Sequence, residues 1–214
     1  MAITVGGRTV LHGTLRFTVS GLWSGYFEVQ GAEALSGAVT IDLESTQLQG
    51  SVRDSLVYSE RTGVEVIAGA DGFATTMRAQ QYRGSPLSLP LGDILRQAGE
   101  TLATGIDSSI TSTILNHWAV QAKSAGKALY DLVEHVQTSW WALDDGSIFL
   151  GVPDWEVVEP EHQLTNTLLE LREYEIAPTD YSLRPGKTFL GQRISRVKYT
   201  IQPSSLRALV EITQ

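Results

Sequence analysis

The sequence predicts an α+β fold that is mainly β, in which two small barrel-like β regions flank an α/β insert with two helices. Short segments with alternating apolar and polar residues recur in the first third of the chain, at roughly ten-residue spacing. Helical periodicity replaces this alternation after residue 80, and β-type alternation returns after residue 166. These shifts predict three parts, over residues 1–79, 80–152 and 153–214.

The first part is predicted to be a small barrel or sandwich. Residues 11–19 and 37–44 alternate apolar and polar side chains, as strands with one buried face do. Residues 55–69 are typical of a hairpin around a Glu-Arg-Thr-Gly turn, in which Gly63 would supply the positive φ.

The insert is predicted to contain two helices. The first has an apolar side that includes Leu91 and Leu95, and Pro90 lies at its first turn, where the missing N–H costs nothing. The second begins after Ser124, a residue type favoured at the N-cap. A strand over residues 114–121 separates the two helices.

A hairpin over residues 140–151 is predicted to end the insert. Asp145 and Gly146 favour a type I′ turn between its strands. Trp140 and Trp141 are adjacent in the first strand, so their rings should face opposite sides. We expect one ring in the core and the other at the surface or at an interface.

The last part begins with a proline- and acid-rich connection over residues 152–166 and closes with a hairpin over residues 183–214. Ile194 and Val197 have opposite parity in the first strand of that hairpin. One face cannot take both, so a β-bulge near Ser195 and Arg196 is the simplest explanation, and burial of both faces against a partner is the other.

Composition excludes several classes of function. The chain has no cysteine, which excludes disulfides, thiolate catalysis and cysteine-ligated metal sites. The net charge of −8 means that the surface as a whole repels nucleic acid. No apolar run reaches the length of about 18 residues that a membrane span needs, so no membrane partner is expected.

No catalytic, cofactor or metal site is predicted. The histidines have no partner at metal-ligand spacing; they are His12, His117, His135 and His162. Glu156, Glu159 and Glu161 could form a cation site, although a solvated linker is the favoured interpretation.

Aromatic and basic residues give candidates for a subunit interface. Trp23 and Tyr26 lie in a glycine-flanked loop that could stack on a sugar, contact a neighbouring subunit or fold onto its own barrel. Basic residues gather near the end of the sequence, where they could form a positive stripe or protect an edge strand from aggregation. The candidate interface residues are Trp23, Tyr26, Arg193, Arg196, Lys198 and Tyr199.

Two motifs resemble those of the baseplate hub proteins of contractile phage tails and related contractile injection systems. The first is "ALYDLVEHVQTSWWALDDGSIFLG" and the second is "LRPGKTFLGQRISRVKYTI". The resemblance covers residues 80–214 by pattern, and the rest of the chain only by its β character. The matching residues are Leu129, Leu132, Trp141, Asp145, Gly146, Gly151, Leu183, Pro185, Gly186, Gly191, Ile194, Val197 and Ile201. Members of that family are often longer, so this chain would be a minimal hub.

The resemblance implies a structural protein and no enzyme or cofactor. Such a hub forms a homotrimeric ring with two tube domains per chain. It joins the six-fold tail tube to the three-fold central spike and lines the channel for DNA ejection. The implied partners are other copies of the chain, the tail tube or tube-initiator protein, the spike and the baseplate wedge proteins, while viral DNA passes without specific binding. The implied location is the tail baseplate of the virion, assembled in the host cytoplasm.

Two other functions stay open. One is a carbohydrate-binding β module that uses Trp23, Tyr26 or Trp155 as stacking platforms. The other is an acid-type hydrolase, which would require two carboxylates to converge in a cleft. Its candidate acids are Asp93, Asp107, Asp144 and Glu173.

Overall fold

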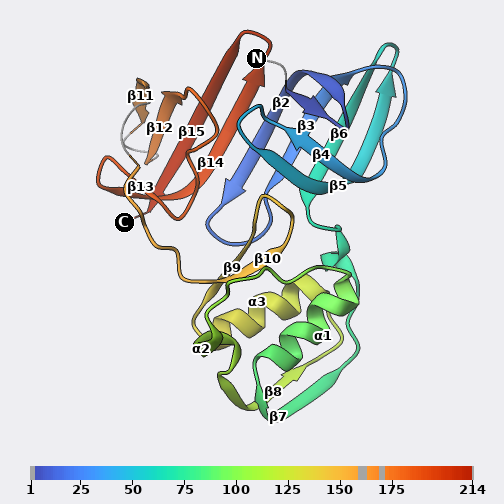
Figure 1. Cartoon of the computed structure of the whole chain (residues 1–214), viewed down its shortest axis with the longest axis vertical. Coiled ribbons are helices and arrows are strands. Elements are labelled where there is room, and N and C mark those ends of the chain that lie inside the picture. Colours follow the sequence, from blue (N-terminus) through green and yellow to red (C-terminus); the bar gives the residue numbers. More distant parts are fainter. Residues whose placement is uncertain (1–2, 159–162, 169–171, 214) are drawn as a thin grey trace.

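A computed structural model describes residues 3–158, 163–168 and 172–213, and it confirms a mainly β α+β fold (Figure 1). The strands are β1 (Thr4–Val5), β2 (Arg8–Thr18), β3 (Ser24–Gln30), β4 (Gly37–Asp42), β5 (Gln47–Tyr58), β6 (Arg61–Ala68), β7 (Gln80–Pro86), β8 (Ile114–Val120), β9 (Ser139–Ala142), β10 (Ile148–Gly151), β11 (Gln163–Leu168), β12 (Glu173–Ala177), β13 (Thr188–Phe189), β14 (Gln192–Gln202) and β15 (Ser205–Thr213). The helices are α1 (Ser88–Ala98), α2 (Ser108–Thr111) and α3 (Ala125–His135), with a 3₁₀ turn at Gly72–Ala74.

The first six strands form a closed antiparallel barrel. Their order is β1-β4-β5-β6-β3-β2, and β1 also pairs with β2, which closes the ring. Glycines make room for the aromatic rings inside: a Cβ on Gly25 would lie 2.4 Å from the Phe27 ring, and one on Gly13 would lie 2.7 Å from it. Phe27 therefore fills the barrel because its neighbours lack side chains.

The second β region is an open sheet that continues from the barrel. β14 pairs with β2 from Arg196↔Thr18 to Ile201↔Gly13, and β15, β12 and β11 follow in that order. Among the described strands, only the first region closes into a barrel. Both regions share one hydrophobic core, in which Phe17 lies 6.2 Å from Tyr199 between ring centroids.

The predicted bulge in the closing hairpin is confirmed. The pairing of β14 with β15 shifts register between Ile194 and Arg196. As a result, Ile194, Val197 and Tyr199 are all fully buried although their parities differ. The extra residue, Ser195, donates a hydrogen bond from Oγ to the Glu211 carbonyl at 3.1 Å.

The insert has a hydrophobic core of its own. α1 and α3 pack together and cover the β7–β8 pair, which lies at the far end of the insert in Figure 1. The predicted helix start is confirmed, because Ser124 Oγ accepts a hydrogen bond from Lys127 N at 3.3 Å. The strand predicted over residues 114–121 is β8.

Two predicted turns differ from the structure. The β5–β6 turn lies at Ser59–Glu60, where Ser59 has a φ of 52°. Gly63 lies inside β6, and a Cβ there would come within 2.6 Å of Tyr26 Oη, so this glycine permits a close approach and does not form the turn.

The turn between β9 and β10 is the second difference. Of Asp145 and Gly146, only Gly146 has a positive φ, of 80°. A type I′ turn needs positive φ at both positions. Instead, Gly146 N donates to the Leu143 carbonyl at 3.0 Å, and Asp145 Oδ1 accepts from Ser147 N at 2.9 Å.

Candidate functional site

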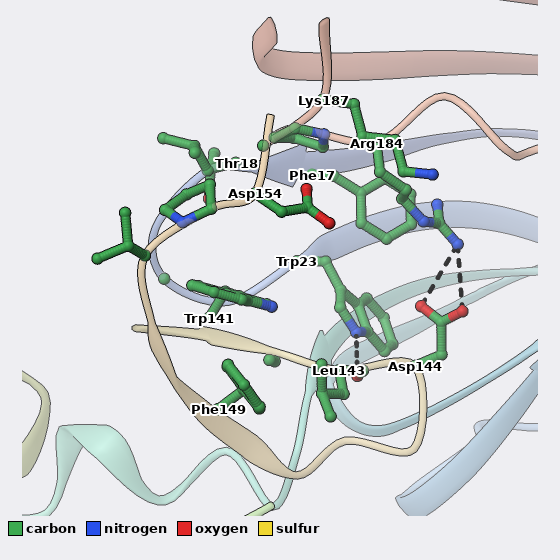
Figure 2. A pocket seen from close by; sticks show the side chains of 17 residues that line it. Phe17, Thr18, Trp23, Trp141, Leu143, Asp144, Phe149, Asp154, Arg184 and Lys187 are labelled. Atoms are coloured by element: carbon green, nitrogen blue, oxygen red, sulfur yellow. Dashed lines mark hydrogen bonds and ion pairs between the residues drawn. The ribbon is translucent and has the colours of Figure 1, made fainter. Parts of the chain in front are cut away.

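A pocket of about 640 Å³ lies where the barrel, the β9–β10 hairpin and the loop before β13 meet (Figure 2). Four aromatic side chains and one ion pair contribute to its walls. These lining residues are Phe17, Trp23, Trp141, Phe149, Asp144 and Arg184. The pocket therefore marks the joint between the three parts of the chain.

The tryptophan pair behaves as adjacent strand residues should. Trp140 is buried in the insert core, where its ring centroid lies 5.2 Å from that of Phe73. Trp141 faces the pocket and stacks against Phe149, with 5.0 Å between ring centroids. A backbone hydrogen bond joins this strand to the loop between β2 and β3 of the barrel, where Gly21 N donates to the Trp140 carbonyl at 2.7 Å.

Arg184 connects all three parts at the edge of the pocket. Its guanidinium carbon lies 3.7 Å from the centre of the Phe17 ring of β2. Its Nη2 contacts both carboxylate oxygens of Asp144 in the hairpin turn, each at 3.4 Å. Stacking and ion pairing together hold the C-terminal loop against the barrel and the insert.

Glu100 forms a second joint between the barrel and the insert. Its side chain is buried and accepts hydrogen bonds from Ala70 N at 2.9 Å and from Gly72 N at 3.0 Å. These backbone groups belong to the segment that leaves the barrel. A buried carboxylate with two amide donors is well satisfied, so Glu100 fixes the direction in which the chain enters the insert.

Two of the predicted interface residues lie in the core of the chain. Trp23 is 2% exposed and Tyr199 is fully buried. Trp23 Nε1 donates to the Leu143 carbonyl at 3.3 Å, and Tyr199 Oη donates to the Leu183 carbonyl at 2.8 Å. Because these rings have no surface to offer a neighbour, we propose no intersubunit role for them, and Trp23 gives no sugar platform.

The other four predicted interface residues reach the surface to different degrees. Tyr26 is 44% exposed beside the β5–β6 hairpin. The Arg193 guanidinium lies 4.9 Å from the centre of the Trp155 ring, and Arg196 pairs with Glu211 at 2.8 Å. Lys198 lies opposite Arg16 across the β2–β14 pair, where two like charges are unfavourable. Their interface role stays a prediction.

The four acids of the hydrolase hypothesis lie on separate elements. Asp93 in α1 accepts a hydrogen bond from Tyr82 Oη at 2.9 Å, and Asp107 caps α2 through Ser109 N at 2.8 Å. Asp144 contacts Arg184 in the hairpin turn, and Glu173 begins β12. Of these four acids, only Asp144 lines the pocket between the barrel, the β9–β10 hairpin and the loop before β13.

Metal-ligating residues do not gather within the described part of the chain, where no group of three or more histidines and acids could hold an ion. His12 Nε2 lies 3.2 Å from Glu28 Oε2 across β2 and β3. His162, Glu159 and Glu161 lie outside the described residues. Within the described residues, no helix is both long and apolar enough to span a membrane.

The shifted pKa values at the joint have structural causes. Burial raises the pKa of Tyr181 and of Tyr199 above the ordinary tyrosine value of 10.0. Hydrogen bonds from the hydroxyl and backbone N–H of Ser147 lower the pKa of Asp145. These groups belong to the core and to a turn, and they form no acid–base pair with each other.

Sequence reasoning missed both joint residues. Arg184 is one of several basic residues near the end of the sequence, and Glu100 lies within the run that the sequence predicts as the first helix. The available signal for Glu100 was Gly99, a left-handed C-cap (φ 71°) that turns the chain back towards the barrel. No local pattern indicates that Arg184 would meet Phe17 and Asp144.

Comparison with solved structures shows which fold this is. No protein-family model and no curated protein matches the sequence. A 43 kDa tail protein of prophage MuSo2 from Shewanella oneidensis matches with a TM-score of 0.70 at 10% identity, over 99% of this chain and 97% of that one. The E. coli c3393 protein, a type VI secretion component with structural similarity to the T4 tail proteins gp27 and gp5, matches with a TM-score of 0.69 at 10% identity, over 100% and 77%.

A tail protein from Neisseria meningitidis MC58 also matches, with a TM-score of 0.64 at 10% identity, over 100% of this chain and 96% of that one. At such low identity, these likenesses concern the fold. The barrel, the insert and the C-terminal sheet thus form an arrangement that occurs in phage tail proteins and in a type VI secretion component.

Proposed function

We propose that this chain is a structural protein of a phage tail or a related contractile injection system, and that it forms the baseplate hub. The observation that carries the proposal is the likeness in fold over 99% or more of the chain to tail proteins and to a secretion component similar to gp27 and gp5. The two hub-like motifs of residues 80–214 support the same function independently.

The proposed hub is a homotrimeric ring that joins the six-fold tail tube to the three-fold spike. In this scheme, residues 1–79 and 153–214 act as the two tube-wall parts, so three chains present six, and residues 80–152 form the insert. Tyr26, Arg193, Arg196 and Lys198 are proposed interface residues. The net charge of −8 suits the wall of a channel through which DNA must pass without binding.

The remaining partners belong to the same proposal. They are the tail tube or tube-initiator protein, the central spike and the wedge proteins, in a virion baseplate assembled in the host cytoplasm. The joints at Arg184 and Glu100 support a structural role, because they fix the insert and both β regions relative to each other.

Sedimentation of the purified chain, alone and with its tube and spike partners, tests the proposal. We expect a species near three times the chain mass of 23.3 kDa, and a ring in electron micrographs. A monomer that binds neither tail partner, and whose tryptophan fluorescence responds to oligosaccharides, would replace the hub with the carbohydrate-binding function.

A further inference from the structure

The β5–β6 hairpin extends beyond the rest of the barrel and leaves one strand edge open. β4 pairs with β5 only as far as Val52, and Leu35 N then donates to Ser55 Oγ at 3.0 Å. From Leu56 to Tyr58, β5 pairs only with β6 among the described strands. A bulge between Val52 and Asp54 marks the point where the strand departs from the barrel.

This open edge carries an apolar surface. Leu56 is 55% exposed, Tyr58 51% and Val57 41%. Leu56 and Tyr58 share the face on which Tyr26 lies, and the missing side chain of Gly63 lets the Tyr26 and Tyr58 rings approach each other. Large apolar side chains on an unpaired edge are typical of a surface that another chain covers.

A second open edge lies on β11, the last strand of the same sheet. β11 pairs only with β12 among the described strands, and Figure 1 shows it on the far side of the molecule from the β5–β6 hairpin. Its residues Leu164 to Thr167 are exposed on both faces, and Leu164 is 41% exposed.

Both edges lack the residues that usually prevent an edge strand from pairing with another chain. Proteins usually protect an edge strand with a charge, most often lysine, or with a proline. The segment Ser55–Ser59 and the strand Gln163–Leu168 contain neither a charged residue nor a proline. Two unprotected edges on opposite sides of the molecule are placed to pair with each other in successive copies.

We propose that the β5 edge of one copy pairs with the β11 edge of the next copy, so that the sheet continues from subunit to subunit. Such an interface is heterologous, and it closes into a ring when the rotation between copies allows it. Leu56 and Tyr58 then pack beside the side chains of the neighbouring strand, and Tyr26 continues the same face two strands away. The number of copies in the ring rests on the proposed function, but the pairing of these two edges does not.

Charge substitutions test whether the two edges meet. Leu56→Lys and Leu164→Glu should each shift the sedimenting species from the oligomer to the 23.3 kDa monomer, because each places a charge at the joint. The double variant L56K/L164E should restore the oligomer, because the lysine of one copy then faces the glutamate of the next. Leu89→Lys in α1, where the side chain is 52% exposed, should leave the oligomer unchanged. Circular dichroism checks that every variant folds.

Disulfide cross-linking gives a second readout, since the chain has no cysteine of its own. Oxidised L56C/L164C protein should form a ladder of covalent oligomers, whereas neither single variant should cross-link at this interface, because its cysteine faces a leucine of the next copy. A double charge variant that stays monomeric, or a chain that neither associates nor cross-links at its highest soluble concentration, would overturn the inference.

The outcomes also separate this inference from the hub. If the largest cross-linked oligomer contains a number of chains other than three, the edge pairing is supported and the trimeric hub is contradicted. A trimer that tolerates both single charges, or an edge that binds only a different tail protein, overturns the edge pairing and leaves the hub in place.

Discussion

The two hydrophobic cores of the chain are built in opposite ways. The core of the barrel and C-terminal sheet takes residues from both ends of the sequence, from Ile3 to Val210. The insert core takes its buried residues only from the stretch between Phe73 and Leu150. The insert is therefore a local structure, whereas the β core depends on segments that are far apart in the sequence.

This difference predicts how far the effect of a destabilising substitution should extend in each core. The two β regions share one sheet through β2 and β14, so damage to one should reach the other. The insert is joined to them mainly through Glu100, the β9–β10 hairpin and Arg184. We expect its stability to be more independent.

The largest expected effect on stability comes from replacing a large buried side chain of either core with alanine. Phe27→Ala should lower the free energy of unfolding by about 3–5 kcal/mol, and Leu129→Ala in the insert by about 2–5 kcal/mol. Hydrogen exchange should distinguish them. F27A should speed exchange in β14 and β15 as well as in β2 and β3, whereas L129A should act within residues 73–150. Unchanged protection of β14 in F27A would contradict the shared core.

A smaller effect is expected from adding one methyl group in each part. Gly25→Ala should destabilise the β core by about 1–3 kcal/mol, because the new Cβ would lie 2.4 Å from the Phe27 ring. Gly92→Ala in α1 is the matched control, because no atom lies within 4 Å of its Cβ position. It should stabilise the insert by about 0.5–1 kcal/mol through helix propensity. Chemical denaturation measures both, and a stabilised G25A protein would refute the tight barrel filling.

The smallest effect concerns buried tyrosines and pH. Burial raises the pKa of Tyr199 above 10.0, so folding favours its neutral form. Its contribution to stability is complete below the unfolded pKa and is lost as the pH rises above 10.0. Tyr199→Phe should cost about 1 kcal/mol at neutral pH through the lost hydrogen bond to Leu183, and should weaken the alkaline loss of stability.

Denaturation at neutral and alkaline pH measures this prediction, with Tyr130→Phe, at a residue that is 50% exposed, as control. An alkaline pH dependence that is the same in Y199F and in the parent chain would contradict it. The tyrosines Tyr181 and Tyr199 both lie in the β core, so we expect alkali to destabilise that core in particular.

The features that the sequence predicted are those with a local signal. Ser124 precedes an apolar stripe at helical spacing, and the change of parity between Ile194 and Val197 requires a bulge. The pairing of β2 with β14 has no such signal, because its partners Leu15 and Tyr199 are brought together only by the folded sheet. The contact of Trp23 with the Leu143 carbonyl and the joint at Arg184 also connect segments that are far apart in the sequence, so they escaped prediction.

Strand β2 is made well before its partner β14, which follows it by about 180 residues in the sequence. Until then, the edge of β2 from Gly13 to Thr18 has no strand to pair with, and Leu15 and Phe17 lack part of their cover. A nascent chain stalled before residue 196 would hold a nearly complete barrel with apolar side chains exposed along β2. Chaperones should therefore bind such arrested chains more strongly than chains that contain β14.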